Sequence, residues 1–183
     1  MARLVFNVAG YTFEVGLDQL RRAYDKSMAT LEDERHRLEL DFREFRAAEA
    51  AGEAASVEYD ASGEPLYRRE QLHEMLLKNA EAALHIGRNA YVVALHHYWE
   101  RCCKAWMGEE CYRYGEAYRR LKRHGLSVDK QGLETLRKAC NAIKHGDAER
   151  RTEADAIDAM FNAVRSSGIT STSLAAPPFR PRP

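Results

Sequence analysis

Apolar residues recur at helical spacing along most of the chain. Over residues 17–51 they are separated by three, four or seven positions, and charged residues occupy the opposite face. A second stretch covers residues 67–107, and its second half is apolar on most sides, which is typical of a helix at the centre of a bundle. Shorter helical patterns cover 109–124, 130–145 and 154–166. The pattern predicts an all-α helical bundle with two long antiparallel helices and three shorter ones.

The segments outside the helical patterns have a different character. Aromatic and β-branched residues flank Ala9-Gly10, so residues 1–16 are predicted to hold a small β-hairpin. Turn residues over 57–65 indicate a second hairpin tip between the two long helices. Residues 167–183 are rich in Ser, Thr, Ala and Pro and are predicted to be a flexible tail. The bundle itself is therefore expected over residues 17–166.

Composition narrows the class of protein. The 183 residues are 45% hydrophobic, and 28 basic side chains match 28 acidic ones, which argues against a protein that coats DNA through its overall charge. The four cysteines form no CxxC pair, and the chain shows neither a signal peptide nor an apolar run long enough for a membrane. These features predict a cytoplasmic protein with free thiols and no membrane association.

The end of the fourth helical pattern carries the most informative polar residues. Residues 136–146 are predicted to form the last turns of a helix that ends at Gly146. Lys138, Asn141 and His145 share one face of it, with Arg137 beside them. A basic residue, an amide and an imidazole together can bind or cleave an anionic ester. The alternative is an ordinary helix end, where cations are favoured by the helix dipole.

The helix order and this helix end resemble the HEPN superfamily of small helical bundles. The resemblance covers about residues 67–166, and its carriers are Asn141 to Gly146 and the stretch Tyr98-Trp99-Glu100-Arg101. It implies a dimeric bundle, and many members are metal-independent RNases in toxin–antitoxin and antiviral systems. The family pattern has an Arg directly before the Asn, whereas this chain has Cys140. The motif is therefore degenerate here.

The resemblance also implies roles for the residues of this helix end. His145 would move a proton, because its pKa lies near neutrality, and Asn141 would orient the reacting groups. Lys138 or Arg137 would hold the phosphate in place of the missing family Arg. Two copies across a two-fold axis would complete the site, and no cofactor is required.

Another polar group lies within the apolar second long helix. His96 and Glu100 are separated by four residues and can pair, or Glu100 can approach the helix of His145 and orient its imidazole. With His97 they form an HHxxE pattern, which is not a recognised zinc spacing, so no metal site is predicted. A zinc site from the cysteines and His145 also lacks ligand spacing.

The segment 112–124 is the most basic part of the chain and interleaves tyrosines with cations. Such a surface can stack bases and bind phosphates, or it can be a helix with core tyrosines and solvated arginines. The candidate RNA-binding residues are Arg113, Arg119, Arg120, Lys122 and Arg123.

Two functional hypotheses follow. The first is a HEPN-like metal-independent endoribonuclease or toxin of bacterial antiviral defence. The second is a non-catalytic HEPN-like binding or scaffold subunit of a larger assembly. Both include a homodimer, and both allow RNA and a partner protein that binds the first long helix or the C-terminal tail. A metal-dependent hydrolase is disfavoured because carboxylate clusters are lacking.

Overall fold

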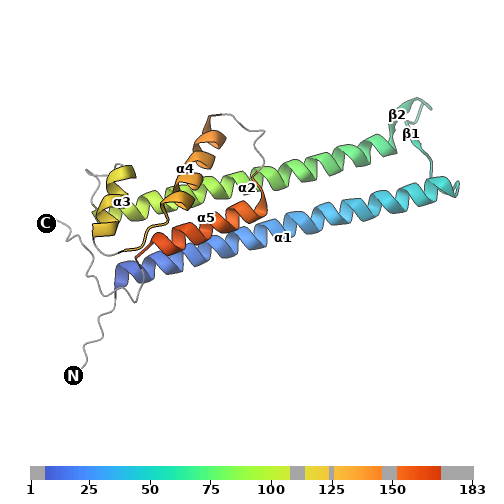
Figure 1. Cartoon of the computed structure of the whole chain (residues 1–183). Coiled ribbons are helices and arrows are strands. Elements are labelled where there is room, and N and C mark those ends of the chain that lie inside the picture. Colours follow the sequence, from blue (N-terminus) through green and yellow to red (C-terminus); the bar gives the residue numbers. More distant parts are fainter. Residues whose placement is uncertain (1–6, 108–113, 124–125, 146–151, 170–183) are drawn as a thin grey trace, which may run out of the picture. The chain divides into compact units, whose positions relative to one another are not determined.

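A computed structural model describes residues 7–107, 114–123, 126–145 and 152–169. This part of the chain is mostly helical and contains one pair of short strands (Figure 1). The elements are α1 (Val8–Ala50), β1 (Val57–Tyr59), β2 (Pro65–Arg68), α2 (Arg69–Met107), α3 (Tyr114–Arg123), α4 (Lys130–Lys144) and α5 (Ala154–Ser167). The predicted class, with two long helices and three shorter ones, is confirmed.

The chain forms two compact units, and each long helix contributes to both. The first unit contains the chain up to Tyr24 and again from Arg88 onward, and the second contains residues 25–87. The first unit therefore combines the start of α1 and the end of α2 with α3, α4 and α5.

Aromatic side chains form much of the core of the first unit. The Phe13 ring of α1 lies 5.9 Å from Tyr98, 6.4 Å from Trp99 and 5.2 Å from Trp106, measured between ring centroids. The Tyr98 hydroxyl donates a hydrogen bond of 2.7 Å to the Phe13 carbonyl. Because α1 is contacted by so many rings of α2, burial of apolar and aromatic area holds the two helices together.

Helix α5 packs against both α4 and the start of α1. The Phe161 ring lies 5.9 Å from Tyr24, and Arg21 of α1 forms a 2.8 Å ion pair with Asp158. Contacts between α4 and α5 are extensive, and the buried face of α5 includes Ile157 and Val164. This arrangement positions α4 beside α2 in the first unit (Figure 1).

In the second unit the long helices also run antiparallel. Phe42 and Phe45 of α1 stack on His73 of α2 at 5.3 and 5.2 Å. Met28 lies against Gly87, where a Cβ would approach the Met28 methyl carbon to 2.8 Å. Strands β1 and β2 pair antiparallel between the helices, so the hairpin tip predicted near residues 57–65 is confirmed.

The N-terminal hairpin predicted over residues 1–16 is wrong for Val8–Val15, which are the first residues of α1. The Asn7 side chain accepts a 3.1 Å hydrogen bond from the Gly10 N–H, as an N-cap residue does. The helix then buries Phe13 and Leu17, which are one turn apart, on one face. Residues 1–6 lie outside the described part of the chain.

The flexible tail predicted from residue 167 is wrong for Ser167, Gly168 and Ile169, which are buried. The Ser167 hydroxyl accepts a 2.8 Å hydrogen bond from the Asp129 N–H. Gly168 lies so close to Phe13 that a Cβ would come within 1.9 Å of the ring. The rest of the predicted tail, residues 170–183, lies outside the described residues.

By residue type, Ser127 is the predicted N-cap before α4 and Thr152 the predicted N-cap before α5, and the structure uses neither. Asp129 rather than Ser127 caps α4, because its carboxylate accepts a 2.9 Å hydrogen bond from the Gly132 N–H. Thr152 does not cap α5, since its hydroxyl donates to Asn89 Oδ1 at 3.1 Å. The Thr152 hydroxyl is therefore bonded to the buried Asn89 instead of to a backbone N–H at the start of α5.

Candidate functional site

The end of α4 presents three polar side chains together. The helix buries Leu133, Leu136 and Cys140, and it exposes Lys138, Asn141 and His145. His145 is the C-cap residue, and its backbone N–H donates a 3.0 Å hydrogen bond to the Asn141 carbonyl. The three predicted side chains therefore lie on the face that a ligand can reach, as their spacing indicates.

Arg137 differs from these three residues because it forms an ion pair with Glu134 of the same helix. Its guanidinium contacts the Glu134 carboxylate through two nitrogens, at 2.5 and 3.1 Å, and both side chains are about one-third exposed. The hydrogen bond from Arg137 lowers the pKa of Glu134, and the charge of Arg137 adds to this effect. Lys138 is thus the more accessible of the two predicted phosphate-binding cations.

Cys140 faces the interior. It is fully buried, and burial raises the pKa of its thiol. The charge of Glu100 on α2 raises this pKa further, whereas Lys144 lowers it through its charge and a hydrogen bond. The position that replaces the family Arg therefore lies toward α2 and Glu100, away from the exposed face of Asn141 and His145.

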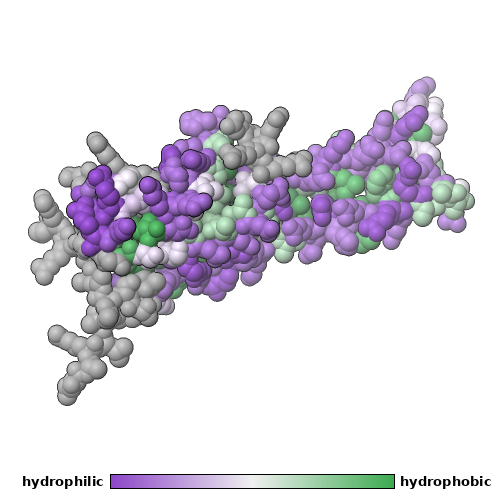
Figure 2. Space-filling model, in the orientation of Figure 1, coloured by the Kyte–Doolittle hydropathy of each residue, from purple (hydrophilic) through white to green (hydrophobic). Residues whose placement is uncertain are grey.

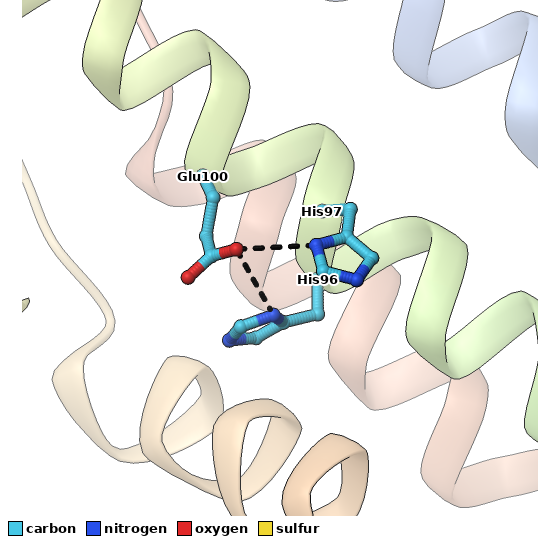
Figure 3. A group of neighbouring side chains, drawn as sticks. All are labelled: His96, His97 and Glu100. Carbon is cyan, nitrogen blue, oxygen red and sulfur yellow. Dashed lines mark hydrogen bonds and ion pairs between the residues drawn. The ribbon is translucent and has the colours of Figure 1, made fainter. Parts of the chain in front are cut away.

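A second polar cluster lies on α2, on the side of α4. Glu100 Oε2 lies 3.7 Å from Nδ1 of the buried His96 and 3.2 Å from Nδ1 of the more exposed His97. Figure 3 shows both rings and the carboxylate converging from successive turns of the helix. Within the described residues, this is the one group of three His, Cys, Asp or Glu donors with metal-ligand proximity.

The electrostatics of His96 connect this cluster with α4. Burial lowers the pKa of His96, Glu100 opposes that shift, and the charges of His97, Lys144 and Arg137 add to it. Glu100 and His96 therefore lie near the part of α4 that carries Arg137, Cys140 and Lys144. Their predicted role in orienting His145 stays a prediction.

Sequence reasoning missed two residues of this region. The spacing of His97 with His96 and Glu100 matches no known zinc pattern, yet a helix brings residues three and four positions before Glu100 within reach of its carboxylate. Lys144 is the second of them, because its charge lowers the pKa of both Cys140 and His96. The sequence could have indicated Lys144, because it follows Cys140 by four residues, which is about one helical turn.

The basic helix α3 carries four cations and one carboxylate. Three of the cations surround Glu116, at 3.2 Å for Arg119, 3.1 Å for Arg120 and 3.4 Å for Arg123. Lys122 is exposed, and the opposite face buries Ala117 and Leu121. The predicted residue Arg113 lies outside the described part of the chain. On the face that Figure 2 shows, hydrophilic side chains gather over α3 and α4.

An open groove borders the α2 cluster within the first unit. His97, Glu100 and Lys104 of α2 line it together with Gly16 and Gln19 of α1, and its volume is about 770 Å³. Small polar or anionic molecules can therefore reach His97 and Glu100 from solvent.

No protein-family model matches the chain, and neither the curated proteins nor the solved structures include a significant match. Among the described residues, no helix is sufficiently long and apolar to cross a bilayer.

Proposed function

We propose that this protein is a HEPN-like, metal-independent endoribonuclease that acts at the exposed end of α4. The observation that carries the proposal is the joint exposure of Lys138, Asn141 and His145 on one face of a helix whose other face is buried. For cleavage by the ribose 2′-OH, an imidazole can move the proton, a cation can stabilise the phosphate charge, and an amide can orient the phosphate. Their resemblance to the HEPN helix end supports the same chemistry.

In the proposed reaction, the His145 imidazole removes the proton from a ribose 2′-OH. The 2′-oxygen attacks the adjacent phosphorus, and the bond to the 5′-oxygen breaks, which leaves a 2′,3′-cyclic phosphate and a 5′-hydroxyl. Lys138 stabilises the charge that develops on the phosphate oxygens, and Asn141 orients the phosphate by hydrogen bonding. His145 of the partner subunit in a homodimer supplies the proton for the leaving 5′-oxygen.

The cations of α3 support RNA as the substrate class. Arg119, Lys122 and Arg123 are exposed, and α3 and α4 both belong to the first unit. Phosphate contacts of this kind hold a strand without reading its sequence. A cytoplasmic toxin or antiviral nuclease would need such broad RNA binding.

The decisive experiment is cleavage of labelled single-stranded RNA in the presence of EDTA. His145→Ala should reduce the rate by about 10²–10⁴-fold, as loss of a general acid–base does. His36→Ala is the matched control, because His36 is an exposed helical histidine of the second unit. RNA that stays intact with the wild-type protein, or equal rates for wild type and His145→Ala, would contradict the proposal.

A non-catalytic binding or scaffold subunit is the second candidate, and the surface of the second unit favours it. Six of the eight large hydrophobic side chains exposed in the described residues belong to this unit. They are Leu40, Tyr59, Leu66, Tyr67, Met75 and Ile86. These side chains are available to a partner protein, either a second copy or another subunit.

Light scattering at micromolar concentration tests whether this apolar surface joins two copies of the chain. The wild-type mass should be that of a dimer, and Ile86→Glu should lower it, because a charge would enter an apolar interface. Lys78→Glu, at an exposed position of the same helix, is the control that should leave the mass unchanged. A monomeric wild type would argue against the dimer and against a site shared between two subunits.

A further inference from the structure

The His96–His97–Glu100 cluster contains two imidazoles and one carboxylate on adjoining turns of α2. The ligating atoms of the three side chains all lie within 4.8 Å of one another. Both imidazoles direct Nδ1 toward the same oxygen of Glu100 (Figure 3). Three donors of these types are thus already gathered before any ion binds.

The spacing of the donors fits a tetrahedral ion. Zinc takes nitrogen and oxygen ligands at about 2.0–2.2 Å, which separates neighbouring ligands by roughly 3.3 Å. The two Nδ1–Oε2 distances of 3.2 and 3.7 Å lie close to that value. A small rotation of the side chains would therefore suffice to bind an ion.

The cluster is open on the side of His97, so a fourth ligand can reach a bound ion. His96 is buried, whereas the His97 side chain is 47% exposed and borders the open groove with Glu100. Two histidines and a glutamate with one open position form a donor set that zinc enzymes use. Imidazole and carboxylate ligands also suit Co²⁺ and Ni²⁺.

We propose that His96, His97 and Glu100 bind one divalent transition-metal ion of the Zn²⁺ type, and that a molecule in the groove provides its fourth ligand. This site goes beyond the proposed cleavage chemistry, which requires no metal. It lies on α2, and none of its ligands belongs to the exposed face of Lys138, Asn141 and His145.

Two cations of α4 act on the same cluster and provide a specific test. Arg137 is neutralised in part by Glu134, but Lys144 is exposed and its charge reaches His96. A positive charge at this place repels a bound cation. Lys144→Gln should therefore strengthen metal binding.

The experiment is calorimetric titration of the chelator-treated full chain with Zn²⁺, in the absence of RNA, accompanied by Co²⁺ absorption spectra. One ion should bind per chain, without the sulfur-to-metal charge-transfer absorption that a cysteine ligand would add. His97→Ala and Glu100→Gln should each weaken binding beyond the roughly 10–100-fold that a change outside the ligand shell causes. Circular dichroism would show that both variants remain folded.

His36 and Glu39 offer a matched control, because they form a helical His–Glu pair at 3.7 Å in the second unit. His36→Ala and Glu39→Gln should leave the affinity for Zn²⁺ unchanged. The proposal is overturned by absence of binding, by thiolate absorption, or by affinity that His97→Ala and Glu100→Gln do not alter. Because RNA is absent from the titration, its outcome is independent of the cleavage assay.

Discussion

Cys140 shows how one side chain determines what the degenerate motif can do. Its thiol is fully buried beside α2, where Glu100 and Lys144 both act on it. An arginine at this position would have to place its guanidinium in the interior instead of beside Asn141 and His145. The substitution that restores the family pattern in the sequence therefore would not restore a cation on the exposed face.

Overpacking of a core typically costs about 1–3 kcal/mol. We expect Cys140→Arg to lower the free energy of unfolding by more than this, because the substitution also buries a charge. RNA cleavage should not increase. Urea unfolding of Cys140→Arg and of the near-isosteric Cys140→Ser measures the difference. A variant as stable as wild type and faster in cleavage would show that position 140 reaches the site.

Helix α4 illustrates how an element end depends on its cap. The sequence favours Ser127 as the capping residue, yet Asp129 accepts the hydrogen bond from Gly132 and donates its own N–H to Ser167. The turn before α4 is thus held from both sides. This position sets where the helix begins and hence which of its later residues face α2.

Asp129→Ala should lower the free energy of unfolding by about 1 kcal/mol, since loss of an N-cap typically costs about 0.5–2 kcal/mol. Ser127→Ala should change it by less than about 0.5 kcal/mol, as exposed substitutions away from a cap do. Thermal and urea unfolding of both variants would measure this contrast. If Ser127→Ala were the more damaging substitution, the cap assignment would be wrong.

The two units of the molecule differ in how much apolar area they bury. In the second unit Met28, Phe45 and Leu84 are the buried hydrophobic residues, whereas the first unit contains all the other buried hydrophobic residues of the described chain. A region with few buried contacts opens locally at a lower free energy. The second unit is also the one that exposes most of the large apolar side chains.

Hydrogen exchange should therefore be faster in the second unit. Amides of α2 between Val92 and Cys103 should be strongly protected, and those of α1 between Met28 and Phe45 should exchange earlier. Mass-spectrometric exchange on the free protein measures both segments in one experiment. Equal protection in dilute solution would indicate that a bound partner or second copy already covers the second unit.

The helical content follows from local sequence alone. Apolar residues at spacings of three and four can share a buried stripe only in a helix, so both long helices and all three short ones were predictable. The exposed face of Lys138, Asn141 and His145 followed in the same way, because the apolar positions of α4 indicate its buried side.

Other features required contacts between residues far apart in the chain. Val8–Val15 has the composition of a strand, but the rings of α2 bury Phe13 and stabilise a helix. Ser167 and Ile169 look like the start of a polar tail, but Asp129 and the buried interior of the first unit hold them. The orientation of Cys140 toward Glu100 likewise depends on how α4 packs on α2.

Periodicity in this sequence thus determined which segments are helical and which face of each is polar, because both follow from the geometry of one helix. Only the tertiary structure decided which side chains of α4 act on the polar cluster of α2. The convergence of His96 and His97 on Glu100 depends on their rotamers, and the reach of Lys144 to His96 depends on the packing of two helices. Helical spacing places His96 and His97 within reach of Glu100, but it fixes neither their rotamers nor the approach of α4 to α2.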